Sequence, residues 1–142
     1  MLGFHARGLD DFLDRTHGHQ LFDNSSTVYA GALPPSLLGM LNQGVVRFTA
    51  TPDALNFMER AYAPTGELER PTLTLHTSRY PVAPLFHEVM YKQTVDRAGA
   101  GSLLAQRTID AYGHCAFTVS QMATAFDDLA GWVQTGVRPT GL

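Results

Sequence analysis

The order of predicted elements in the second half of the chain constrains its fold most strongly. Residues 71–77 (PTLTLHT) form a leucine and threonine run typical of a buried strand, and residues 103–109 predict a second strand. Residues 84–98 between them have the apolar spacing of a helix, and another helix follows the second strand. The order strand, helix, strand, helix predicts an α/β fold with two adjacent parallel strands joined by a right-handed crossover.

The last helix has the clearest local signals. Thr118 and Gln121 match a capping box, in which the two side chains bind free main-chain N–H groups at the helix start. Gly136 and Pro139 mark its end. Apolar residues spaced by three and four predict the face that this helix buries: Val119, Met122, Phe126, Leu129 and Val133.

The first half predicts short helices joined by loops, and its strongest helix start is at Thr51 and Pro52. Thr51 is a favourable N-cap, and Pro52 suits the first helical position because its missing N–H costs nothing there. We expect a single domain over residues 1–142. It would consist of a helical segment, residues 1–63, followed by a β-α-β-α segment, residues 64–142.

Composition argues against several classes of protein. With 44% hydrophobic and 16% charged residues, the chain has enough apolar side chains for a globular fold. Its net charge of −3 argues against a nucleic-acid-binding protein, which usually carries a basic face. One cysteine excludes an internal disulfide and a multi-cysteine zinc site. No apolar run is long enough to cross a membrane, and residues 1–13 lack the apolar core of a signal peptide, so we expect a cytoplasmic protein with no membrane partner.

Several stretches of the chain carry a family resemblance. The sequences TLHTSRYPVAPLFHE (residues 74–88) and YGHCAFT (residues 112–118) resemble the C-terminal part of an α/β-hydrolase-fold enzyme of the serine esterase and peptidase-like group. The stretch from FDNSSTVYAG through NQGVVRFTATPDALNFMERAYAPTGEL (residues 22–68) resembles the helical cap-side segment of the same enzymes. The resemblance implies a truncated α/β-hydrolase-like fold that keeps the last two strands of the family's sheet. It also implies chemistry on carboxylic esters.

The resemblance implies a site around His114. The family uses a serine on a sharp strand-to-helix turn, an acid after the penultimate strand and a histidine after the last strand. His114 matches the histidine, but Tyr80 stands where the family has aspartate, and no G-x-S-x-G sequence is present. Tyr80 either bonds to His114 or a substrate oxygen, or covers the loop. Ser78 is either a nucleophile on the same edge or a turn residue. Asp110 either orients His114 or faces solvent at the strand end.

Other chemistry-bearing residues have weaker patterns. Cys115 is either a nucleophilic thiol or an inert buried residue, and the second interpretation is favoured. His17 and His19 lack a third ligand at a metal-site spacing, so we expect neither a metal nor another cofactor. Four apolar residues could line a pocket for a small apolar ligand between the first-half helices and the sheet: Phe48, Phe57, Met58 and Tyr62.

Two functions fit these observations. The first is a small carboxylic-ester hydrolase in which His114 is the base and a hydroxyl of Ser78 or of another chain is the nucleophile or positions water. The second is a catalytically degenerate hydrolase that associates with itself or binds an apolar ligand. The outer edge of the first strand lacks its family neighbour and is adhesive, so we expect it to be covered. Either the N-terminal helices or a second copy in a homodimer would cover it.

Overall fold

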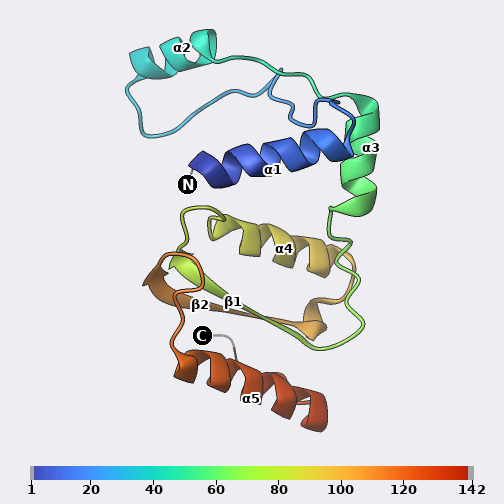
Figure 1. Cartoon of the computed structure of the whole chain (residues 1–142). Coiled ribbons are helices and arrows are strands. Elements are labelled where there is room, and N and C mark those ends of the chain that lie inside the picture. Colours follow the sequence, from blue (N-terminus) through green and yellow to red (C-terminus); the bar gives the residue numbers. More distant parts are fainter. Residues whose placement is uncertain (1, 141–142) are drawn as a thin grey trace. The chain divides into compact units, whose positions relative to one another are not determined.

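The computed structural model describes the main chain of residues 2–140 and the side chains of residues 8–140 (Figure 1). The chain folds as two compact units, Met1–Ala63 and Pro64–Leu142. The first unit contains three helices: α1 (Leu2–Arg15), α2 (Pro35–Gly44) and α3 (Pro52–Ala61). The second unit contains β1 (Thr72–Arg79), α4 (Phe86–Arg97), a short 3-10 helix (Gly101–Leu103), β2 (Leu104–Tyr112) and α5 (Val119–Thr135).

One buried amide organises the helical unit. Asn24 donates from Nδ2 to the Val46 carbonyl at 2.9 Å, and its Oδ1 accepts a hydrogen bond from the Phe48 N–H at 2.6 Å. Apolar burial contributes little here, because Ala54 is the only buried side chain within the described helices α2 and α3. The loop between α1 and α2 is therefore held mainly by hydrogen bonds to the segment that precedes α3.

Asp23 makes a second hydrogen-bonded contact between that loop and the segment that leads into α3. Its carboxylate accepts hydrogen bonds from the Ser25 hydroxyl at 2.7 Å and from the Ala50 N–H at 3.0 Å. The Ser25 and Ala50 hydrogen bonds lower the pKa of Asp23 from its usual value of 3.8. α3 begins at Pro52, as predicted, but the Thr51 hydroxyl makes no capping hydrogen bond to the helix.

β1 and β2 pair in parallel, which confirms the two parallel strands predicted from the sequence. The register runs from Thr72 opposite Leu104 to Thr77 opposite Ile109, and an irregularity follows before Arg79. Both strands run in the same direction, so their carboxyl ends meet at one edge of the sheet. Within the described residues, the sheet has these two strands alone.

α4 and α5 cover opposite faces of this sheet (Figure 1). On one face, Glu88 of α4 accepts hydrogen bonds from Thr74 Oγ1 at 2.6 Å and Gln106 Nε2 at 2.7 Å. On the other face, Arg107 of β2 donates to Asp128 of α5 at 2.5 Å. Side chains of adjacent strand residues alternate between faces, which accounts for this division. The apolar core lies between α4 and β2 and comprises Leu68, Tyr91, Val95, Ala100 and Leu104.

The strands extend further than the apolar pattern predicts. β1 continues to Arg79 and β2 to Tyr112, into polar sequence. Ser78 donates a hydrogen bond to Asp110 at 2.9 Å, so a polar contact joins the two strands beyond their apolar part. The crossover helix begins later than predicted, at Phe86, because the chain first bends through a proline-containing stretch.

α5 confirms the predicted capping box and alters the predicted buried face. The Gln121 N–H donates to Thr118 Oγ1 at 3.1 Å, and the Thr118 N–H donates to Gln121 Oε1 at 2.9 Å. The buried residues of α5 are Ala125 and Trp132, whereas Val119, Met122, Phe126 and Val133 of the predicted stripe are exposed. Leu129 of that stripe is half-buried, and Asp128, which pairs with Arg107, lies on the same side of the helix as the buried residues.

Candidate functional site

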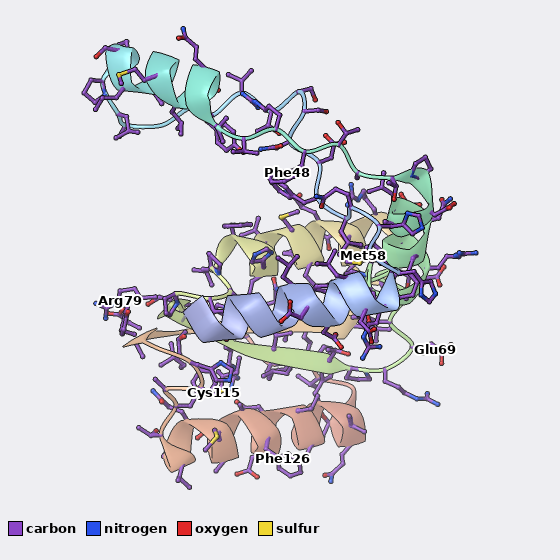
Figure 2. All side chains as sticks on the ribbon, turned by 45° about the horizontal axis from the view of Figure 1, so that its top comes forward. Phe48, Met58, Glu69, Arg79, Cys115 and Phe126 are labelled. Carbon is purple, nitrogen blue, oxygen red and sulfur yellow. The ribbon has the colours of Figure 1, made fainter. Side chains whose placement is uncertain are left out.

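Loops and strand ends at the carboxyl edge of the sheet bring several reactive side chains near one another. We define the carboxyl-edge cluster as Ser78, Tyr80, Asp110, His114 and Cys115, which come from the ends of β1 and β2 and the loops that follow. Figure 2 labels Arg79 and Cys115 at this end of the unit. The two strands are parallel, so the residues after each strand necessarily emerge on the same side.

Ser78 and Asp110 form a pair within this cluster. Ser78 Oγ donates to Asp110 Oδ1 at 2.9 Å, and Arg79 Nη2 approaches the same oxygen at 3.1 Å. Asp110 is strongly exposed, in keeping with the solvent-facing residue considered from the sequence. The structure thus directs both Ser78 and Asp110 toward each other, and it records no hydrogen bond from either side chain to His114 among the described residues.

The imidazole of His114 contacts Tyr80. Their ring centroids are 5.0 Å apart with an interplanar angle of 33°, which is a tilted stack. Tyr80 also lies 5.7 Å from the ring of His76. The phenol of Tyr80 therefore lies between the imidazoles of His76 and His114.

His76 is a member of this stack that the sequence analysis did not select. His76 lies in β1 and Tyr80 directly follows its last residue, four positions later, so continued alternation of an extended chain favours one face for both. This spacing is the signal in the sequence that could have linked the two rings. Nδ1 of His76 lies 2.8 Å from the Thr77 carbonyl oxygen, which fixes the orientation of its ring.

Cys115 is exposed, which corrects the favoured interpretation of an inert buried residue. It has a φ of 49°, in the left-handed region that non-glycine residues seldom occupy. This sharp turn directly after β2 keeps the thiol out of the core. Cys115 Sγ lies 3.5 Å from Nε2 and 3.8 Å from Nδ1 of His114. The two distances are nearly equal, so the sulfur lies about equally far from both ring nitrogens. A thiol hydrogen-bonded along the lone pair of one nitrogen would lie much farther from the other.

An apolar groove lies between β1 and α5 and reaches Cys115. We call it the β1–α5 groove; its volume is about 360 Å³, and it is lined by Leu73, Leu75, Cys115, Phe117, Met122, Ala125, Phe126 and Leu129. No charged side chain lines it. The groove has the volume and apolar lining of a small-ligand site, although it is open along one side.

The four residues predicted to form an apolar pocket all belong to the helical unit. The ring of Tyr62 packs edge-on against Phe57 and against Phe12, each at 5.6 Å between centroids. Phe48 packs in the same way against Phe22 at 6.1 Å. Figure 2 labels Phe48 and Met58, the latter on α3. Phe48, Phe57 and Tyr62 thus each have an aromatic partner inside their own unit.

Among the side chains of residues 8–140, no group of three or more histidine, cysteine, aspartate or glutamate residues is placed to hold a metal ion. His17 and His19 line a hollow of about 350 Å³ together with Arg15 and Asp53. No helix in the described part of the chain combines the length and apolar character needed to cross a membrane.

The chain was compared with protein-family models, curated proteins and solved structures, and it matches none of them.

Proposed function

We propose that the chain is a hydrolase-like protein that cleaves small carboxylic esters with His114 as the general base. The observation that carries the proposal is the stacking of His114 and Tyr80 beside Cys115, at the end of an apolar groove. Histidine is the side chain that most often transfers protons in enzymes. Ligands of α/β proteins commonly bind at the carboxyl ends of parallel strands, where this cluster lies. We further propose that β1 and β2 correspond to the last two strands of an α/β-hydrolase sheet.

Water is the nucleophile that best fits this arrangement. The Ser78 hydroxyl is bonded to Asp110, so its proton is not directed at the imidazole. In the proposed reaction, His114 takes a proton from water as the water oxygen attacks the ester carbonyl carbon. The Tyr80 hydroxyl donates a hydrogen bond to the carbonyl oxygen as negative charge develops on it. When the tetrahedral intermediate collapses, the imidazolium returns the proton to the departing alkoxide, which leaves an acid and an alcohol.

Hydrolysis of p-nitrophenyl acetate tests this proposal. We expect His114→Ala to lower kcat/KM roughly 100-fold or more, the usual contribution of a general base. His87→Ala is the matched control, because His87 is also an exposed histidine but lies on α4, outside the carboxyl-edge cluster. Equal rates for the wild type and both variants would mean that the turnover comes from surface imidazoles in general, and the role proposed for His114 would be rejected.

A second candidate function is a catalytically inactive, hydrolase-like module that binds an apolar ligand. The pairing of Ser78 with Asp110 supports it, because this pairing leaves His114 without an activated hydroxyl. The β1–α5 groove supplies a binding surface of suitable character. Absent ester turnover, together with saturable binding of a fluorescent fatty acid that Phe126→Ala weakens, would favour this function over hydrolysis.

A further inference from the structure

We propose that a second copy of this chain docks on the outer edge of β1. The two β1 strands would pair antiparallel about a two-fold axis, and the two β1–α5 grooves would join across that axis. The β1–α5 groove also enters the proposed function, but the dimer is argued from the edge of β1 and the flank of α5, and its test measures association and not ester turnover, so the two proposals can fail separately.

Ahead of Arg79, the sequence of β1 lacks the charged residues and prolines that usually protect a sheet edge. Within the described residues, β2 pairs with one edge of β1 and no strand pairs with the other. From residue 72 to residue 78, β1 carries no aspartate, glutamate, lysine or arginine, whereas β2 carries Arg107 and Asp110. Charged residues and proline are the common means of preventing strand addition. The outer edge of β1 is therefore more open to the addition of another strand than the outer edge of β2.

The exposed flank of α5 lies beside this same edge. Asp128 faces Arg107 of β2, so that flank of α5 is directed toward β2. Phe126 precedes Asp128 by two residues, about 200° around the helix, and so lies on the opposite flank. Phe126 is 70% exposed although it lines the groove. Together with exposed Met122 it leaves an apolar surface next to an unpaired strand, and such surfaces usually mark interaction sites.

The sequence of β1 makes a second copy the occupant that fits this surface. If the two-fold axis passes through Thr74, Leu73 of one copy stands opposite Leu75 of the other, on the face that α5 covers. Thr72 then stands opposite His76 on the other face. Leucine pairs and threonine–histidine pairs bring no like charges together, so the strand is compatible with itself.

The same two-fold symmetry brings the two β1–α5 grooves together on one face of the sheet. A two-fold axis perpendicular to the sheet keeps both α5 helices on the same face, so Met122 and Phe126 of each copy border one continuous apolar surface. The result is a four-stranded sheet in the order β2, β1, β1, β2. Sheets of three or more strands are much more stable than isolated pairs, which gives the association a driving force beyond apolar burial.

Analytical ultracentrifugation over a range of concentrations tests the proposal. We expect the wild type to dimerise and Phe126→Glu to raise the dimer dissociation constant at least about 100-fold, because it brings two carboxylates into an apolar interface. Thr124→Glu is the matched control: Thr124 is exposed on the same helix, but it lies about 160° around the helix from Phe126 and does not line the groove. Unchanged circular dichroism in both variants would show that they fold.

A disulfide tests the register directly. In a Cys115→Ser background, Thr74→Cys would face its own copy across the axis and should form a covalent dimer under mild oxidation, whereas Ser78→Cys at the strand end should not. A wild type that stays monomeric at the highest concentration reached would overturn the proposal. A dimer that Phe126→Glu leaves intact, or one that cross-links equally through both cysteines, would also overturn it.

Discussion

Asp128→Asn removes the charge partner of a buried guanidinium. The side chain of Arg107 is only 7% exposed, and among the described residues Asp128 is the group that accepts its hydrogen bond, at 2.5 Å. Nε of Arg107 is buried and has no partner there. The substitution therefore leaves a cation in a poorly hydrated position between β2 and α5. We expect this to be among the most destabilising polar substitutions in the second unit.

The size of the effect follows from the burial of the two partners. Breaking a fully buried ion pair by removing one partner costs about 3–5 kcal/mol. Asp128 is 40% exposed, so water can reach part of the site and lower that cost. A charged hydrogen bond alone contributes about 1.5–3 kcal/mol. We expect Asp128→Asn to lower the free energy of unfolding by about 2–3 kcal/mol. Arg107→Met should cost less than about 1 kcal/mol, because it removes the buried charge itself.

Urea unfolding followed by tryptophan fluorescence measures these values. Trp132 is the single tryptophan, and it is buried on α5, the helix that the ion pair holds. With an m value of about 2 kcal/mol per molar urea, the predicted loss shifts the midpoint by about 1 M. Lys92→Met is the control, because it removes an exposed ion pair with Asp96 and should cost under about 1 kcal/mol. The reasoning would be refuted if Asp128→Asn lowered the free energy of unfolding no more than Lys92→Met does. It would also be refuted if Asp128→Asn and Arg107→Met lowered it equally.

Two further predictions concern single positions. Gly66→Ala should destabilise the fold by roughly 2–4 kcal/mol, because Gly66 has a φ of 79° and a Cβ there would lie 2.5 Å from the Thr94 carbonyl oxygen. Gly99→Ala, with a φ of 78° and no neighbour within 4 Å, should cost only about 1–2 kcal/mol in the same urea assay, and equal costs would contradict the steric argument. The pKa of Asp23 is lowered below 3.8, so its carboxylate stabilises the fold above that pH, and the stabilisation is lost as pH falls through the folded pKa. Asp23→Asn should therefore flatten the dependence of the urea midpoint on pH between about pH 5 and about pH 2, measured by circular dichroism, and an unchanged slope would show that Asp23 contributes nothing to it.

Local signals in the sequence predicted the elements of the second unit well. The capping box of Thr118 and Gln121 is formed by neighbouring residues, so it could be read without knowledge of the rest of the fold. The order of strands and helices likewise required parallel pairing of β1 and β2. The buried face of α5 was predicted only in part: the apolar stripe borders the groove beside β1, but the contact of Arg107 with Asp128 on the other flank joins residues far apart in the sequence and had no local signal.

The candidate site was predictable as a location but not as a set of contacts. The parallel strands had to bring Ser78, Asp110 and His114 to the same edge. The side-chain partners depended on how far pairing continued: because β2 extends to Tyr112, Asp110 is still within the strand and faces Ser78. The left-handed turn at Cys115, which exposes the thiol, had no clear signal in a sequence of ordinary loop residues.

The buried amide of Asn24 also bears on the chemical ageing of the protein. Deamidation would replace its Nδ2 donor with a carboxylate oxygen, which would then face the Val46 carbonyl oxygen now 2.9 Å away. Two acceptors at that distance repel each other, and the loop would lose a main tie to the segment before α3. The three hydrogen bonds that now hold the side chain also restrain it from the motion that deamidation requires. Conversion of this one amide to a carboxylate would therefore weaken the contact between the α1–α2 loop and the segment before α3.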